Sequence, residues 1–220
     1  MENIELQIIS EMYEKNNKLV IFDAGGYDFC DAVCFKKNFP LSEVYSFEAD
    51  DLNIEKYSKD IINFGINVIP LALSDSNGSV NFFSSLTFTN NLGKTKDHTS
   101  SGSILKPIVK NGTNECVNHP GLVFSEKTKS VPCIRIDDFC KQNNIKKIDF
   151  FHLDVQGAEN IVLAGLGDKL RPQYIFCETC EYTTYDTKGM EKQKFNFFMK
   201  ELGYDIVKEL RHDTIYKYNG

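Results

Sequence analysis

The chain has 220 residues, of which 41% are hydrophobic, and its net charge is −6 with a pI of about 5.3. This length is enough for one full hydrophobic core, so we predict a single domain over residues 1–220. No basic block appears, which argues against a nucleic-acid partner. The apolar runs are far shorter than the ~20 residues that a membrane span needs. The first residues also lack the basic start and apolar centre of a signal peptide.

Seven cysteines, an odd number, lie mostly inside expected strands and helices. This distribution is typical of reduced thiols in a cytoplasmic protein. Cys177 and Cys180 form a CxxC pair, but a zinc ribbon needs two such pairs. We therefore interpret these cysteines as small buried hydrophobic residues.

Apolar runs alternate with helical patterns along the chain. In the first half we expect strand, helix, strand, helix and strand at residues 18–24, 29–39, 44–48, 51–63 and 66–72. In the second half we expect strand, helix, strand and helix at 148–154, 158–164, 174–178 and 191–202, and then a hairpin of strands 204–208 and 214–218. This order predicts an α/β fold with a mostly parallel sheet, helices on both faces and an antiparallel hairpin at the C-terminus.

Residues 84–129 interrupt this alternation. The segment is rich in Ser, Thr, Asn, Gly and Lys, and short strand-like pieces, "SVNFF" and "SVPCIRI", flank it. A loop of this length inside a compact domain is usually a functional lid or disordered. We predict that it forms a lid or a wall of the acceptor site, so that shortening it would reduce turnover more than cofactor binding.

The first strand ends in an acid that two glycines follow. Asp23 lies in "VIFDAGGYDFCD", ahead of Gly25, Gly26 and Tyr27. Ligands of open α/β sheets bind beyond the carboxyl ends of the strands. Since glycines lack a Cβ atom, the pair predicts a place where a ligand approaches the backbone closely.

The following strands also end in chemistry that suits a nucleoside. Glu48, which precedes Ala49, can accept hydrogen bonds from the two cis hydroxyls of a ribose. Leu73 can cover a purine face, and Asp75 can accept a hydrogen bond from the exocyclic amine of the purine. With Asp154 at the end of the fourth strand, these positions predict a nucleoside-binding edge of the sheet.

Phosphate-binding motifs do not fit the sequence. Tyr27 stands where a G-x-G-x-x-G motif starting at Gly25 needs its second glycine. The stretch "LGKT" resembles the end of a P-loop, but Phe88 stands at the position of the first glycine and no buried strand precedes it. A ligand with ribose and adenine, no phosphate and an amino-acid tail is S-adenosylmethionine.

Several stretches together resemble the FkbM-type class I methyltransferases, from about Val20 to Glu178. They are "FDAGGYDFCD", "VYSFEAD", "IPLALSDSNGSVNFF", "IRIDDFC", "IDFFHLDVQGAENIVLAGL" and "IFCE". The resemblance implies a Rossmann-like sheet and methyl transfer from S-adenosylmethionine to oxygen, often on sugars or small hydroxylated metabolites. Two positions depart from the family pattern: Phe29 replaces a third glycine, and His152 replaces a lysine.

Candidate general bases lie near the expected methyl group. Asp154 ranks first because it ends its strand, and Glu178, at the end of the next strand, resembles an acid that is common there in the family. His152 shares a strand face with Asp154 but lies about 6–7 Å deeper, so we expect a supporting role. His98 could reach the acceptor if the long loop is a lid. Metal binding by the two acids stays open, since spacing does not decide it.

Two other classes of function remain open at this stage. A binding or scaffold protein could keep the nucleoside pocket without turnover, and the absent third glycine favours this reading slightly. An NAD-dependent oxidoreductase could use a similar sheet, although the phosphate motif is missing. Mass spectrometry of the ligand that the purified protein retains would separate these alternatives.

Overall fold

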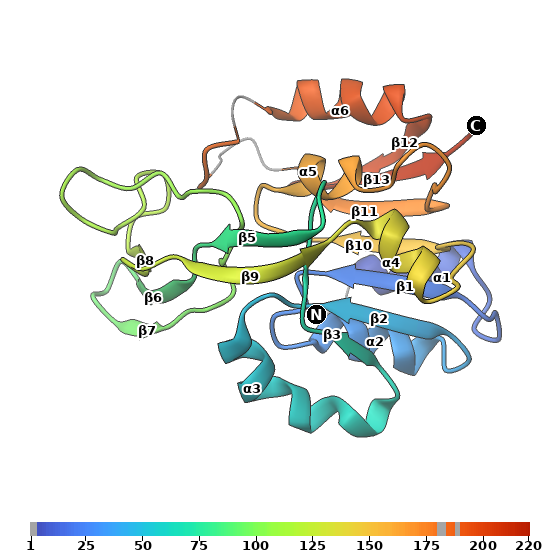
Figure 1. Cartoon of the computed structure of the whole chain (residues 1–220), viewed down its shortest axis with the longest axis horizontal. Helices are drawn as coiled ribbons and strands as arrows, with labels where there is room; N and C mark the ends of the chain where they lie inside the picture. The colour runs from blue at the N-terminus through green and yellow to red at the C-terminus, as the bar shows by residue number, and fades with distance from the viewer. Residues whose placement is uncertain (1–3, 180–183, 188–189) are drawn as a thin grey trace.

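The computed structural model describes residues 4–179, 184–187 and 190–220. Within these ranges the central sheet has seven strands, in the spatial order β12-β13-β11-β10-β1-β2-β3 (Figure 1). Their bounds are Val20–Ala24 (β1), Glu43–Phe47 (β2), Asn67–Ile69 (β3), Phe150–Leu153 (β10), Tyr174–Glu178 (β11), Tyr204–Glu209 (β12) and Asp213–Tyr218 (β13). The strands β1, β2, β3, β10 and β11 run parallel, and β13 is antiparallel to both β11 and β12. The predicted sheet and its terminal hairpin are confirmed.

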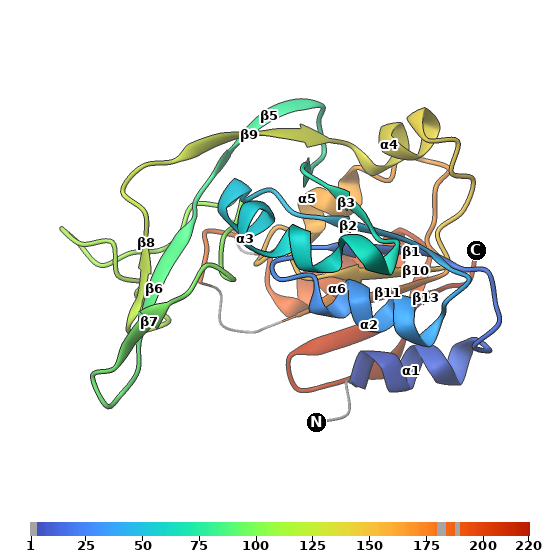
Figure 2. The ribbon, with the colours of Figure 1, turned by 90° about the horizontal axis from the view of Figure 1, so that it is seen from below.

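Helices cover both faces of this sheet (Figure 2). One face carries α1 (Ile4–Met12) and α2 (Cys30–Asn38), and the other carries α4 (Ile136–Gln142), α5 (Glu159–Ala164) and α6 (Lys192–Glu201). Neighbouring strand residues point to opposite faces, so Phe150 packs with α2 while Phe151 belongs to the core under α4 to α6. Two hydrophobic cores thus hold the parallel strands in register.

The third predicted strand, 66–72, is wrong in extent and in pairing. The central sheet contains only β3, which ends at Ile69, because Pro70 has no N–H for a ladder. The chain then continues as β4 (Ala72–Leu73), which pairs with β9 (Lys129–Ile134) in a second sheet that also contains β5 (Gly78–Phe82). Leu73 therefore comes from a different sheet than the strand ends around it.

The segment 84–129 is not a structureless loop. It contains β6 (Ser85–Thr89), β7 (Thr95–Asp97) and β8 (Leu122–Phe124), which form a small antiparallel sheet to one side of the central sheet (Figure 1). A local hydrophobic cluster of Cys116, Leu122, Phe124 and Tyr185 supports this sheet. The composition hid these strands because each is short and the apolar positions are few. We call residues 84–129 the insertion.

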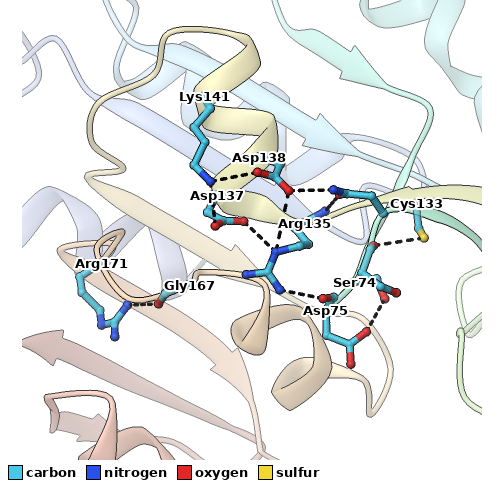
Figure 3. A network of polar contacts seen from close by, with 11 residues as sticks. Ser74, Asp75, Cys133, Arg135, Asp137, Asp138, Lys141, Gly167 and Arg171 are labelled. Atoms are coloured by element: carbon cyan, nitrogen blue, oxygen red, sulfur yellow. Dashed lines mark hydrogen bonds and ion pairs between the residues drawn. The ribbon is translucent and has the colours of Figure 1, made fainter.

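A polar network fixes the turn that follows β4. Arg135 donates from Nε to Asp137 (3.0 Å) and from a guanidinium nitrogen to the backbone oxygen of Asp75 (2.7 Å), as Figure 3 shows. Its own backbone N–H donates to Asn77 (2.9 Å). The "ALSDSNG" stretch is thereby tied to the start of α4, so Leu73 is held firmly at the edge of the central sheet.

Gly165, after α5, packs against this same turn. A Cβ atom on Gly165 would meet the backbone oxygen of Ser74 at less than van der Waals distance. We expect Gly165→Ala to lower the free energy of unfolding by about 1–3 kcal/mol, as for other overpacked sites. Urea unfolding measures the change, with Lys169→Ala as an exposed control nearby. Equal stability of both variants would show that the turn moves away freely.

Candidate cofactor and acceptor site

A pocket lies at the carboxyl ends of the parallel strands, where β1, β2 and β10 meet the second sheet and the insertion. Seven of the predicted cofactor-binding residues line it: Gly25, Gly26, Tyr27, Glu48, Ala49, Leu73 and Asp154. Residues from four separate stretches of the chain thus converge on one cavity, as expected for a ligand site in an open α/β sheet.

Two predicted residues lie outside this pocket. Asp23 is buried beneath it, where one carboxylate oxygen accepts from the Ser46 hydroxyl (2.5 Å) and the other contacts His152 Nδ1 (2.8 Å). Asp75 is exposed, and its carboxylate accepts from the hydroxyl of Ser74 (3.3 Å). Asp23 and His152 therefore stabilise the pocket floor from below, and the Asp75 carboxylate does not line this pocket.

The glycine pair is explained by packing of the chain on itself. Gly25 has a φ of +92°, and a Cβ atom there would collide with the carbonyl oxygen of Asp154. A Cβ atom on Gly26 would lie 2.5 Å from the Ser46 hydroxyl. Both backbone N–H groups donate to the carbonyl of Phe47 (3.0 and 2.9 Å). Besides lining the pocket, the two glycines therefore let the ends of β1, β2 and β10 meet.

Phe29 keeps the backbone conformation that a glycine would adopt. Its φ is +61°, in the left-handed region, and its side chain is fully buried. Such a conformation costs roughly 1–2 kcal/mol for a residue with a side chain. Burial of the aromatic ring, which lies against Gly26, offsets this cost. The departure from the family pattern at Phe29 therefore leaves the turn into α2 intact.

Glu48 directly follows β2 and lines the pocket. It is 6% exposed, and its two oxygens accept from the backbone N–H groups of Tyr27 (2.7 Å) and Asp50 (2.6 Å). Burial raises the pKa of Glu48 to about 7, although these backbone hydrogen bonds oppose the shift. Each carboxylate oxygen keeps a second lone pair, so Glu48 can still accept from a ribose hydroxyl.

Asn53, on the first turn of α3 (Asp51–Ile61), is a pocket residue that sequence reasoning missed. Its Nδ2 donates to the carbonyl of Thr99 in the insertion (3.2 Å). Its Oδ1 is buried and, among the described residues, has no hydrogen-bond partner. An acceptor of this kind beside Glu48 suits the hydroxyl-rich nucleoside of S-adenosylmethionine. Asparagine in a helical first turn is too common to signal a ligand by itself.

The insertion is anchored at both of its ends to one residue. Asp50, which is buried and caps α3, accepts from the Ser84 hydroxyl (2.7 Å) and from Lys129 Nζ (2.9 Å). Between these anchors, residues 99, 100 and 102–104 line the pocket. The insertion thus forms a wall of this pocket, so we now expect that shortening it would reduce cofactor binding as much as turnover.

His98 does not line this pocket, nor a second pocket that adjoins it and is described below. Its Nε2 lies 2.9 Å from the Ser101 hydroxyl, and burial, followed by the nearby Lys96, lowers its pKa. Thr99 and Ser100, which do line the pocket, follow it directly. His98 thus shapes the wall, and the structure does not place it at the reacting atoms.

Gly102 allows a sensitive test of this wall. A Cβ atom there would lie 2.6 Å from the ring of Phe82, which also lines the pocket. We expect Gly102→Ala to displace the ring or the wall and to weaken S-adenosylhomocysteine binding by about 3–10-fold, while the protein stays folded. Calorimetric titration measures this, with the exposed Asn111→Ala as a control in the same insertion. Unchanged affinity would mean that the wall adapts without effect on the ligand.

A second pocket adjoins the first. Its polar lining includes Glu178 at the end of β11, Thr179, Thr184, Thr187 and Lys192. Gln156 lines both pockets, and Asp154 lies on the cofactor side. The Nε2 atom of Gln156 donates to Asp154 (2.7 Å) and to Glu178 (3.3 Å). The two first-ranked base candidates are therefore joined at the boundary between the pockets.

Glu159 supports the turn beneath this boundary. Its Oε1 accepts from the backbone N–H groups of Val155 (3.3 Å) and Gly157 (3.1 Å). Burial is the main cause that raises its pKa to about 8, and the charges of Glu178 and Asp154 add to it.

In the described part of the chain, no three His, Cys, Asp or Glu side chains group so that they could hold a metal ion.

Cys177 is a fully buried free thiol, as predicted, and burial raises its pKa well above the ordinary value. Its CxxC partner, Cys180, lies outside the described residues.

The strand order and the reversed last strand are those of the Rossmann-like fold of class I methyltransferases. A solved structure from Staphylococcus aureus, itself assigned only provisionally as a caffeoyl-CoA O-methyltransferase, shares this fold. It has a TM-score of 0.55 and 10% sequence identity, and the match covers 100% of this chain and 85% of that chain.

The sequence comparison is more specific. The methyltransferase FkbM domain matches residues 20–206. The chain is also similar to the 2-O-methyltransferase NoeI of Sinorhizobium fredii (strain NBRC 101917 / NGR234), with 30% identity over 185 residues, 83% of this chain and 71% of that protein. The chain belongs to the FkbM methyltransferase family, and its cofactor is S-adenosylmethionine.

Within the described ranges, no helix combines the length and the apolar character that crossing a membrane requires.

Proposed function

We propose that the protein transfers a methyl group from S-adenosylmethionine to a hydroxyl oxygen of a sugar or another small hydroxylated metabolite. The observation that carries this proposal is the meeting of two pockets at Gln156, with Asp154 on one side and Glu178 on the other. One pocket suits the nucleoside, and the adjoining pocket suits a polar acceptor.

In the cofactor pocket, we assign Glu48 to the ribose hydroxyls, with Asn53 beside it. Leu73 and the neighbouring apolar wall suit the face of the adenine. When bound, S-adenosylmethionine supplies a methyl group that its sulfonium charge already activates. The protein then has to align the acceptor oxygen with that group, and good alignment alone can lower a barrier by several kcal/mol, up to about 7–11 in ideal cases.

In the adjoining pocket, the described lining is rich in groups that hydrogen-bond hydroxyls. Asn160, Thr179, Thr184 and Thr187 can donate and accept, and Glu178 accepts. Asp154 removes the hydroxyl proton as the oxygen–carbon bond forms and the sulfur–carbon bond breaks. Glu178 ranks second as the base. His98 and His152 rank behind both, because neither lines a pocket at this boundary.

The relative named as a 2-O-methyltransferase supports transfer to oxygen. The six described cysteines are free thiols, which are typical of a reducing compartment, and we propose the cytoplasm as the location. The acidic net charge supports a small acceptor over a nucleic acid.

A paired experiment tests the function. Calorimetry measures binding of S-adenosylhomocysteine, and mass spectrometry follows methyl transfer to a panel of free glycosides, nucleotide sugars and phosphorylated metabolites. We expect binding together with a mass increase of one methyl group on a hydroxylated acceptor. Methylation of nitrogen or carbon in the product would refute the O-methyltransferase assignment. Binding with no transfer to any member of the panel would favour the alternative of a binding protein without turnover.

A further inference from the structure

Gln156 adopts a left-handed backbone conformation, which residues other than glycine rarely adopt. Its φ is +56°, and Gly157, with a φ of +92°, follows it in the turn between β10 and α5. The left-handed region costs roughly 1–2 kcal/mol for a residue other than glycine. Strain of this kind persists where the surroundings enforce it, and it concentrates at functional sites. Glu159 enforces it here by binding the backbone on both sides of Gln156.

The strained turn places the Gln156 amide between two acids. Nε2 lies 2.7 Å from Asp154 Oδ1 and 3.3 Å from Glu178 Oε2. Because both partners are acceptors, the amide nitrogen rather than the amide oxygen has to face them. Its two hydrogens are enough for one bond to each carboxylate.

We propose that Gln156 is a positioning residue that holds Asp154 and Glu178 as one hydrogen-bonded unit at the boundary between the cofactor and acceptor pockets. This inference rests on the proposed function of the same site. The amide aims the Asp154 carboxylate at the acceptor hydroxyl, and it stabilises two like charges that would otherwise repel each other. As a neutral donor, the amide can bond both carboxylates without itself exchanging a proton.

Other titratable groups surround the two acids, and most of them increase the electrostatic strain. Charge interactions with Asp154, Glu178 or both extend to Glu159 on α5, Cys177 on β11, Asp213 on β13 and the buried Tyr185. Lys192 lines the acceptor pocket and pairs with Glu209 (3.4 Å). Among the described neighbours, Gln156 therefore supplies a close donor at a place where acids predominate.

The test compares the wild type with Gln156→Met, which keeps the length of the side chain but removes the donor. Carbon-13 NMR of the labelled carboxyl groups follows the titration of Asp154 and Glu178 without any acceptor. We expect both titrations in the variant to move to higher pH, since a lost hydrogen bond to the charged form favours protonation. The acid limb of the kcat profile should move in parallel, with kcat lower by about tenfold and KM changed less.

Gln173→Met is the matched control. Gln173 is exposed, and its side-chain Nε2 donates to the backbone carbonyl of Tyr218 (3.4 Å), which lies far along the chain from Asp154 and Glu178. If Gln156→Met does not fold, Gln156→Asn replaces it, because asparagine tolerates the left-handed conformation but is too short to reach both acids. Unchanged carboxyl titrations would overturn the positioning role even if the enzyme is active. Shifted titrations in a protein that methylates no hydroxyl would support the role and refute only the proposed function.

Discussion

Asp154→Asn is expected to lower the rate of methyl transfer by at least the ~10²-fold that loss of acid–base catalysis typically costs. The asparagine keeps the shape of the side chain but cannot take a proton at neutral pH. Asp154 directly follows β10, lines the cofactor pocket and accepts from Gln156, so we expect an entering hydroxyl to meet this acid first. Single-turnover kinetics at saturating cofactor isolates the chemical step, and calorimetry checks that S-adenosylhomocysteine still binds.

Two companion variants make this result specific. Glu178→Gln removes the second-ranked base and should reduce the rate less than Asp154→Asn does. His152→Lys restores the residue that the family usually has and should be tolerated, because His152 touches the buried Asp23 rather than either pocket. Full turnover in Asp154→Asn, or lost turnover in a folded His152→Lys protein, would reverse the ranking of the bases.

Glu48→Ala is expected to weaken S-adenosylhomocysteine binding by about 1.5–3 kcal/mol, the range for hydrogen bonds to a charged group. The substitution removes the acceptor that we assign to the ribose. It also leaves the backbone N–H groups of Tyr27 and Asp50 without their partner. The 2′- and 3′-deoxy analogues of S-adenosylhomocysteine provide the control. Each lacks a ribose hydroxyl, so the affinities of wild type and variant for an analogue should differ much less. Equal affinity in both proteins would exclude Glu48 as the ribose ligand.

The same residue predicts how stability depends on pH. The pKa of Glu48 is raised from 4.5 to about 7 in the folded protein, so the folded state binds the proton more tightly than the unfolded state. Its contribution therefore favours folding at low pH and is lost as the pH rises from about 4.5 through about 7. With 1.36 kcal/mol for each pKa unit, the loss amounts to at most about 3 kcal/mol.

Glu48→Gln isolates this contribution, because the amide resembles the protonated acid and does not titrate. Urea unfolding of both proteins at about pH 5 and about pH 8 gives, for each protein, the slope of the free energy of unfolding with pH. We expect the variant to lose less stability than the wild type over this interval, while it binds the cofactor more weakly at the higher pH. Glu159, whose pKa is also raised by burial, is present in both proteins and cancels in the comparison. Identical slopes would mean that Glu48 is ionised in the folded protein throughout this range.

Local pattern was sufficient for most of the central sheet and for several residues of the pocket at its carboxyl edge. Short apolar runs between helical patterns predicted β1, β2, β10 and β11, because a strand buried on both faces has to be apolar along its whole length. Parallel strands that share an edge bring their carboxyl ends together. Glu48 and Asp154, at two such ends, therefore line one cavity, as their positions along the chain predicted.

The tertiary structure alone decided which polar side chains line the pocket and which serve the fold. Asp23 ends its strand as Glu48 does, but Ser46 and His152 occupy its carboxylate below the pocket. Asp75 is turned away because Pro70 ends β3 and passes the chain to another sheet. These outcomes depend on contacts between residues far apart in sequence, which no local pattern contains.

Tertiary contacts also decided the pocket wall and the link between Asp154 and Glu178. Asn53 belongs to the pocket because the insertion brings Thr99 to α3. Gln156 reaches both Asp154 and Glu178 because β10 and β11 are neighbours in the sheet. The sequence by itself therefore determined most of the sheet, the family and several residues that line the pocket, since these follow from local periodicity and motif. The acceptor side and the geometry of its base came from long-range packing, which places side chains only once the strands and the insertion have assembled.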